Sequence, residues 1–128
     1  MLRISGLSYK VQQKLILNKI SLEAKSGEII CLLGPSGCGK TSTLRLIAGL
    51  ERPISGTISI ANQNVTSDKI FIEPHKRKVG FLFQDFALFP HLTAKQNIIW
   101  ALGKRTHNKQ VAELFEQINM VGHEHKYP

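Results

Sequence analysis

Cysteine is scarce in this chain, and long apolar stretches are missing. The two cysteines, Cys31 and Cys38, cannot build a disulfide framework, and neither has a cysteine or histidine partner at zinc-finger spacing. The longest unbroken apolar run, Ile29 to Leu33, is far shorter than the roughly 20 residues of a membrane-spanning helix. The chain also starts without an apolar leader segment. These absences exclude a disulfide scaffold, a zinc finger and a membrane-spanning chain, and they favour a cytoplasmic location.

Acidic residues are few compared with basic ones. Nine Asp and Glu stand against 17 Lys and Arg, which gives a net charge of +8. This balance suits an anionic ligand, a nucleic acid or a lipid surface, and it does not choose among them. With 128 residues and 42% apolar side chains, the chain has the size and composition of one globular domain or part of one.

The apolar pattern changes along the chain from strand-like to helix-like at about residue 92. Alternation predicts half-buried antiparallel strands at 2–11 and 19–25 with a bend at 12–14, further short strands at 57–61 and 79–83, and a turn at Ser55-Gly56. The continuous run at 28–33 predicts a central strand covered on both faces. Helical spacing predicts three helices, one at 40–50, one that Thr93 caps and one that Asn108 caps. The last has an apolar stripe of Val111, Leu114, Phe115, Ile118 and Val121.

Between the predicted central strand and the first predicted helix lies a glycine-rich motif. Residues 34–41, Gly-Pro-Ser-Gly-Cys-Gly-Lys-Thr, fit the phosphate-loop pattern G-x-x-x-x-G-K-[ST]. Glycines let successive backbone N–H groups turn toward a phosphate, and the following helix N-terminus adds positive potential. We expect Lys40 to bridge the β- and γ-phosphates of a nucleotide and the Thr41 hydroxyl to ligate Mg²⁺. A merely flexible glycine-rich turn is the alternative.

Two segments in this order resemble the ATP-binding subunits of ABC transporters. Residues 34–51 resemble the Walker A segment with its helix, and residues 83–93 resemble the Q-loop, particularly that of importers. The resemblance covers the whole chain. It implies an α/β phosphate-loop NTPase of the ABC class with an N-terminal antiparallel β-subdomain. Residues 1–92 would form the β-rich subdomain and phosphate-loop core, and 93–128 the start of a helical subdomain in which the chain is cut short.

The resemblance also assigns roles to individual residues. ATP and Mg²⁺ are the implied cofactors. Tyr9 resembles the aromatic residue that stacks on adenine, with a core tyrosine as the alternative. Gln84 resembles the Q-loop glutamine, which contacts Mg²⁺ and the attacking water, so Lys40 and Gln84 are the expected catalytic residues. The expected nucleotide-binding set is Tyr9, Gly34, Pro35, Ser36, Gly37, Cys38, Gly39, Lys40, Thr41 and Ser42.

Large apolar residues gather where a loop is expected, at Phe86, Leu88, Phe89 and Pro90. Such a cluster is unusual on a free surface. The resemblance implies that it docks a membrane-spanning permease subunit, whereas packing under the helical subdomain is the competing interpretation. A second ATP-binding subunit is the other implied partner, and no nucleic acid is expected. The implied location is the cytoplasmic face of the plasma membrane, as a peripheral protein.

Some parts of the family's catalytic equipment have no counterpart in these residues. No acidic residue follows a run of four apolar residues, as the family's Mg²⁺ ligand and general base do, and its LSGGQ signature is absent. We therefore expect the chain to bind MgATP weakly without hydrolysing it, and to be poorly soluble because its central strand is uncovered. For the importer, iron(III) is the first substrate considered, then polyamines, inorganic anions or sugars. A soluble ABC ATPase acting on ribosomes or nucleic acid, and a non-catalytic remnant of a disrupted gene, are the alternative functions.

Overall fold

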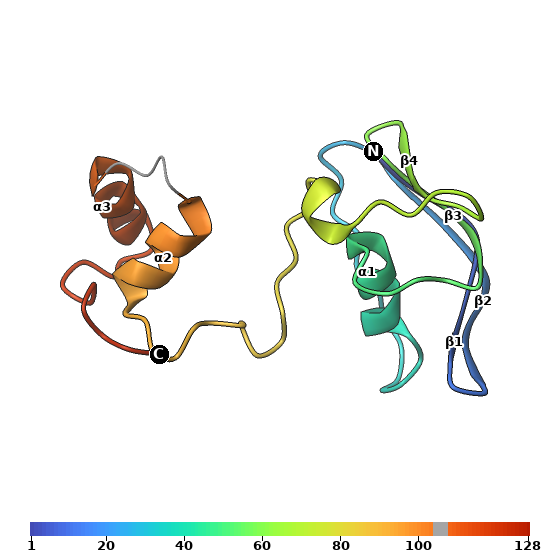
Figure 1. The fold of residues 1–128 in the computed structure, drawn as a ribbon, viewed down its shortest axis with the longest axis horizontal. Helices are drawn as coiled ribbons and strands as arrows, with labels where there is room; N and C mark the ends of the chain where they lie inside the picture. Colours follow the sequence, from blue (N-terminus) through green and yellow to red (C-terminus); the bar gives the residue numbers. More distant parts are fainter. Residues whose placement is uncertain (104–107) are drawn as a thin grey trace. The chain divides into compact units, whose positions relative to one another are not determined.

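A computed structural model describes residues 1–103 and 108–128, which form two compact units, Met1–Phe81 and Leu82–Pro128 (Figure 1). The first unit contains the strands, the first α-helix and a 3₁₀ turn: β1 (Leu2–Val11), β2 (Lys14–Ala24), α1 (Lys40–Ala48), β3 (Ser55–Ile60), β4 (Gln63–Thr66) and η1 (Pro74–Lys76). The second contains α2 (Ala94–Leu102) and α3 (Asn108–Gln117). None of the helices in the described part of the chain is both long and apolar enough to cross a membrane.

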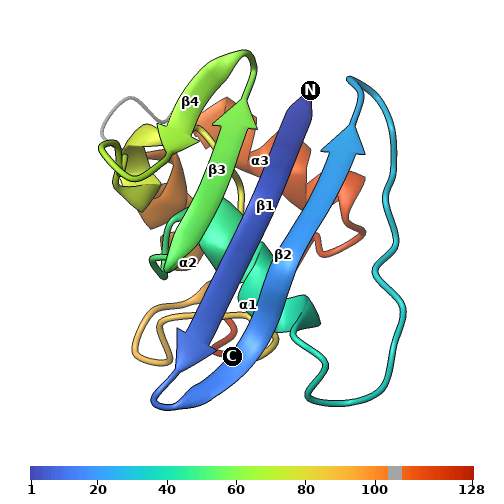
Figure 2. The ribbon, with the colours of Figure 1, turned by 90° about the vertical axis from the view of Figure 1, so that its right-hand side faces the viewer.

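The first unit is built on a four-stranded antiparallel sheet with the order β2-β1-β3-β4 (Figure 2). β1 and β2 form a hairpin in which Val11 pairs with Lys14 across a tight turn. Gln12, in this turn, has a positive φ of 53°. The predicted antiparallel strands and the bend at 12–14 are therefore confirmed, with β2 starting earlier than the predicted residue 19.

Helix α1 packs on one face of this sheet. Its Leu46 is fully buried against Ile4 and Leu7 of β1 and Ile58 of β3. Burying each such side chain contributes about 1.5–3 kcal/mol, so these residues hold the helix in place. Gly49 then ends α1 in the left-handed conformation, and its N–H donates to the carbonyl groups of Arg45 and Leu46. The sheet thereby fixes the helix whose N-terminus follows the glycine-rich motif.

Two predicted strands, at 28–33 and 79–83, are wrong in this structure. Both segments are outside regular secondary structure, and no strand pairs with either of them in the part of the chain described. Ile29 and Leu33 are 90% and 91% exposed. A strand exists only when a neighbour accepts and donates its backbone hydrogen bonds. An apolar run predicts burial, but it does not supply the neighbour.

The predicted turn at Ser55-Gly56 is also wrong, and β4 was not predicted. Gly56 lies inside β3 rather than in a turn. It has φ 99°, and a Cβ there would lie 2.6 Å from the Gly6 carbonyl oxygen and 2.6 Å from Leu7 Cα. The glycine thus allows close approach of β1 and β3. In the sequence, a glycine with this role cannot be told from a turn glycine. β4 was missed because only Val65 and Thr66 of its residues are buried.

A buried arginine connects the end of α1 to the chain that follows the sheet. Arg77 is only 3% exposed. Its guanidinium donates to the carbonyl oxygens of Leu46 and Ile47 at 3.0 Å each, and to the Thr66 hydroxyl at 2.9 Å. Burial lowers the pKa of this guanidinium from its ordinary value. The arginine caps the Ile47 carbonyl group and gives the Leu46 carbonyl group, which also accepts from the Gly49 N–H, a second donor.

In the second unit, Thr93 caps α2 as predicted. The Thr93 hydroxyl accepts from the Gln96 N–H, and the Gln96 side chain accepts from the Thr93 N–H, which completes a capping box. Asn97 binds both backbone groups of Phe89 and so fixes the preceding loop on this helix. In α3, Val111 and Phe115 of the predicted stripe are buried. The helix ends at Gln117, so Ile118 and Val121 lie beyond it and are exposed.

Candidate functional site

The glycine-rich motif runs directly into α1, as its sequence predicts. Gly39 is the N-cap, with φ 97°, and no side chain caps the helix. The first turn of α1 contains no acidic residue. The N–H groups of this turn therefore keep their positive potential and remain available to an external anion.

Gly39 is a position where a side chain would not fit. A Cβ on Gly39 would lie 2.6 Å from Leu17 Cδ2 and 3.2 Å from Ile16 Cγ2. The loop therefore lies close against the Leu17 and Ile16 side chains of β2, at a φ that L side chains rarely adopt. This contact fixes the loop against the β1–β2 hairpin.

Lys40 is turned back onto its own loop. Its Nζ donates to the carbonyl oxygens of Gly34 at 2.8 Å and Pro35 at 2.7 Å, and lies 3.6 Å from Cys38 Sγ. An ammonium held by two carbonyls in this way is positioned at the mouth of the loop with its charge uncompensated. Such a group is suited to a phosphate.

The loop borders a hollow of about 460 Å³. This volume is in the range of small-ligand sites. Of the residues predicted to bind nucleotide, six line it: Ser36, Gly37, Gly39, Lys40, Thr41 and Ser42. Gly34, Pro35 and Cys38 belong to the same loop and contact Lys40 instead. The other wall comes from the β1–β2 hairpin and consists of Val11, Gln12, Lys14 and Ile16.

Tyr9 does not line this hollow. Its position is that of the alternative interpretation, a tyrosine packed on the core. Its ring packs against the buried cluster of the sheet. The neighbouring Glu51 carboxylate raises the pKa of the Tyr9 phenol as a hydrogen-bond acceptor, and burial raises it further. Glu51 follows the C-terminal end of α1, the opposite end from the phosphate loop. Among the described residues that line the hollow, Tyr9 is absent and Val11 is present.

No sequence pattern predicted the part of the hollow that the β1–β2 hairpin forms, called here the hairpin wall. The bend at residues 12–14 was predicted, but nothing in its composition indicated that it would lie beside residues 36–42. That proximity follows from the contact of Gly39 with Leu17 and Ile16, two residues of β2. It depends on tertiary packing rather than on a local pattern.

Gln84 and the apolar cluster belong to the second unit. Gln84 is exposed in a turn closed by a hydrogen bond from the Phe86 N–H to the Phe83 carbonyl. Phe89 packs edge-on against Trp100 with the ring centroids 4.5 Å apart, whereas Phe86 and Leu88 are 67% and 52% exposed. The cluster is therefore divided between internal packing and an exposed surface. The catalytic role of Gln84 remains a prediction.

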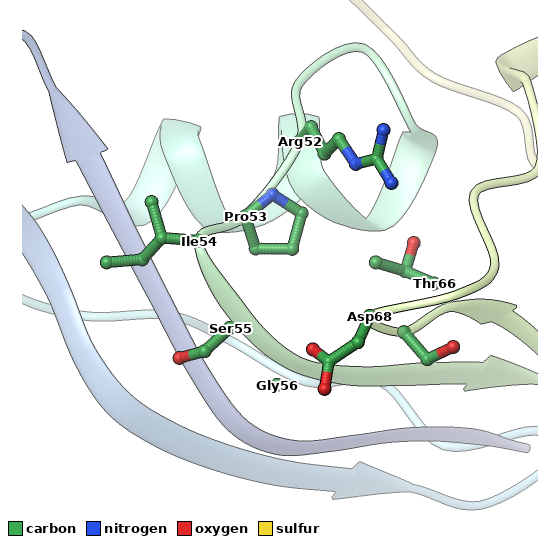
Figure 3. Close-up of a pocket in the computed structure, with 8 residues that line it drawn as sticks. Arg52, Pro53, Ile54, Ser55, Gly56, Thr66 and Asp68 are labelled. Carbon is green, nitrogen blue, oxygen red and sulfur yellow. The ribbon is translucent and has the colours of Figure 1, made fainter.

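A second hollow, of about 260 Å³, lies in the first unit beyond the C-terminal end of α1 (Figure 3). Arg52 and Asp68 face it from opposite sides, with Pro53 and Thr66 between them. Arg52 also lies over the Phe71 ring at 5.3 Å. Because Arg52 and Asp68 carry opposite charges, this hollow does not present the concentrated positive charge that an anion site needs. In the described residues, no group of three or more metal-ligating side chains is assembled either. The phosphate loop is thus the strongest candidate site.

Comparison with known proteins places this loop in a family. The family model for the ABC transporter matches residues 17–128. Among curated proteins, the sulfate/thiosulfate import ATP-binding protein CysA 2 of Chromobacterium violaceum is 45% identical over 116 residues, which cover 88% of this chain and 31% of that protein. The spermidine/putrescine import ATP-binding protein PotA of Acidothermus cellulolyticus is 41% identical over 117 residues, with 88% and 30% covered. The chain thus spans about a third of the length of these relatives.

A solved structure agrees with this result. The dimeric structure of MJ0796, described as a bacterial ABC transporter cassette, superposes with a TM-score of 0.80 at 29% identity. The superposition covers 100% of this chain and 62% of that one. A second structure of MJ0796 is described as a post-hydrolysis state bound to ADP and Pi. The sequence match, the fold and the phosphate loop agree, and the chain belongs to the ABC transporter family, in its ATP-binding domain.

Proposed function

We propose that this chain binds the triphosphate of MgATP at residues 34–42 and serves as the energy-coupling part of an ABC importer. The observation that carries the proposal is the phosphate loop itself, in which Lys40 and the uncapped N-terminus of α1 converge on one hollow. Backbone N–H groups, an ammonium and a helix N-terminus form a recurring phosphate site.

The residues present fit MgATP. The uncapped N-terminus of α1 supplies backbone N–H groups, and Lys40 supplies the cation for the β- and γ-phosphates. Thr41 lines the same hollow and supplies a hydroxyl of the kind that ligates Mg²⁺ in phosphate loops. Bound Mg²⁺ neutralises charge on the phosphates. Gln84 is proposed as the side chain that orients the attacking water and contacts Mg²⁺.

The partner surface proposed for the permease is the exposed part of the apolar cluster. Phe86 and Leu88 offer large apolar side chains to solvent, which is typical of an interaction site. Pro90 belongs to the same loop, whereas Phe89 supports it from inside. A second ATP-binding subunit and a peripheral position at the cytoplasmic face of the membrane complete the proposal, which the names of the importer relatives and the dimeric cassette support.

For the transported substrate, we propose an inorganic anion or a polyamine. The similar curated proteins are named for the import of sulfate and thiosulfate or of spermidine and putrescine. Iron(III), the first choice from sequence, has less support from these names. Uptake of radiolabelled sulfate, spermidine and iron(III) by cells with and without the gene tests the choice. If only iron(III) uptake depends on the gene, this substrate proposal is wrong.

Replacing Lys40 tests the nucleotide site directly. Lys40→Ala removes the charge-assisted hydrogen bonds to phosphate, each worth about 1.5–3 kcal/mol, so the affinity for MgATP should fall by about tenfold or more. Isothermal titration calorimetry measures this affinity.

Lys25→Ala is the matched control, because Lys25 is an exposed lysine outside the hollow. It should bind MgATP as the unchanged chain does. Equal affinity in the Lys40→Ala and unchanged chains would contradict the proposed site.

A further inference from the structure

The second hollow of the first unit has two opposite charges on its walls that do not pair with each other. Arg52 lines it on one side and Asp68 on the other (Figure 3). Both residues are exposed. Among the ion pairs formed within residues 1–103 and 108–128, none includes either of them. The hollow therefore offers a guanidinium and a carboxylate to one ligand.

Each of these charges is positioned by its own segment of the chain. The Arg52 guanidinium lies over the Phe71 ring, 5.3 Å from the ring centroid. Asp68 belongs to a turn in which the Ser67 N–H donates to the Ile70 carbonyl oxygen at 2.8 Å. In the same turn the Ile70 N–H donates to the Ser67 hydroxyl at 3.2 Å. These contacts keep the two charges on separate sides of the hollow instead of letting them meet.

Thr66 adds a buried hydroxyl between the two charges. This residue is only 1% exposed, and its hydroxyl oxygen accepts from the Arg77 guanidinium at 2.9 Å. A hydroxyl that accepts in this way still has its own proton to donate. Because the donor from Arg77 is charged, it polarises the Thr66 hydroxyl and strengthens a hydrogen bond to an anionic acceptor. The anionic group of a ligand is therefore best placed between Arg52 and Thr66.

This charge pattern favours a ligand that carries both charges. A simple anion is attracted by Arg52 and repelled by Asp68, and a simple cation experiences the reverse. A zwitterion gains from both contacts. Its two charges must be separated, because Arg52 and Asp68 lie on opposite sides of the hollow (Figure 3). The volume of about 260 Å³ restricts the ligand to a small molecule.

We propose that the second hollow binds a small zwitterion whose ammonium and carboxylate lie at opposite ends of a short chain, that is, an ω-amino acid. The carboxylate lies against Arg52 and Thr66, and the ammonium lies against Asp68. The described residues that line this hollow and the hollow of the phosphate loop have no member in common. The inference is therefore independent of the proposed nucleotide binding.

A ligand-observed NMR titration of the whole chain tests the inference with three probes of similar size. 4-Aminobutyrate carries both charges, butyrate carries only the carboxylate, and butylamine carries only the ammonium. We expect 4-aminobutyrate to bind at least about fivefold more tightly than either of the other two, because each lost end removes a charge-assisted contact. Equal affinity for the three probes, or no binding of 4-aminobutyrate, would overturn the inference.

Two variants that each remove one charge show which wall holds which end of the ligand. Arg52→Gln should abolish the preference for 4-aminobutyrate over butylamine, because the carboxylate loses its cation. Asp68→Asn should abolish the preference for 4-aminobutyrate over butyrate, because the ammonium loses its anion.

Lys69→Gln is the matched control for the loss of a charge. Lys69 is exposed in the same turn as Asp68 but does not line the hollow, so this variant should keep both preferences. Unchanged preferences in Arg52→Gln and Asp68→Asn would show that the zwitterion binds elsewhere and would overturn the inference. Equal losses in Lys69→Gln would overturn it as well, since they would reflect the overall charge of the chain.

Discussion

Gly39 carries two constraints at one position. Its φ of 97° is one that L side chains rarely adopt, and its Cα faces Leu17 and Ile16 at close range. Gly37, two residues earlier, also has a positive φ, of 78°, but a Cβ there would meet nothing within 4 Å. A substitution at Gly37 therefore tests backbone strain alone, whereas one at Gly39 tests backbone strain together with steric overlap.

Gly39→Ala should destabilise the chain more than Gly37→Ala. Both substitutions strain the backbone, at about 1 kcal/mol or more each. Only Gly39→Ala also forces the loop away from β2, which adds about 1–3 kcal/mol. Urea unfolding followed by circular dichroism measures both free energies of unfolding. Equal destabilisation by the two variants would show that the contact between loop and hairpin is not as tight as described.

Arg77 links elements that are distant in sequence. Its guanidinium binds the last carbonyl groups of α1, the Thr66 hydroxyl of β4 and the Ile72 carbonyl oxygen. It also lies over the Phe71 ring at 4.9 Å. A buried charge with this many acceptors is stabilising only as a complete network, because each acceptor left alone has lost its water.

Arg77→Ala should lower the free energy of unfolding by about 3 kcal/mol or more, because it leaves several buried acceptors without a donor. Arg52→Ala is the matched control, since Arg52 lies over the same ring but is exposed. It should cost about 1 kcal/mol or less. The shift of the urea midpoint in each variant gives the comparison. Similar shifts would mean that the cation over the ring, and not the hydrogen bonds, stabilises this region.

Elements whose signals are local were predictable. The hairpin, α1 and the Thr93 cap each depend on neighbouring residues, and the structure contains all three. The segments at 28–33 and 79–83 could not be predicted in the same way, because strand formation needs a distant hydrogen-bonding neighbour. Gly56 was misread for a related reason. Gly56 allows the backbone of β1 to approach β3 closely, and no local sequence pattern predicts such a contact.

The candidate site likewise has a part that local sequence predicts and a part that depends on tertiary packing. Residues 34–42 were predictable because a phosphate loop is contiguous in sequence and its chemistry requires those residue types. The hairpin wall was not, since Val11 and Lys14 reach the hollow through the packing of β2 on Gly39. Tyr9 was assigned by resemblance, whereas in the structure its ring packs against the buried cluster of the sheet and does not line the hollow.

The molecule as a whole exposes an unusual apolar segment. Ile29 and Leu33 are almost fully exposed, and the backbone of 28–33 is outside the described sheet. An extended apolar segment with unpaired backbone groups is a template for association with another chain. We therefore expect the chain to self-associate at concentrations where a compact domain is monomeric.

Ile29→Lys should reduce this self-association, because a charge on the segment opposes edge-to-edge pairing. Ile54→Lys is the matched control, since Ile54 is also exposed but lies between α1 and β3. Sedimentation velocity over a range of concentrations measures the change. A monomeric unchanged chain with a sharp cooperative melt would contradict the expectation, as would equal effects of the two lysines.

The two carbonyls that hold Lys40 give ligand binding the character of a substitution reaction. A phosphate oxygen that reaches this ammonium replaces an oxygen already bound there, from Gly34 or Pro35. The heat released is then the difference between two charge-assisted contacts and not the full value of one. Only an acceptor more negative than a peptide carbonyl gains from the replacement. The loop therefore selects its ligand first of all by charge.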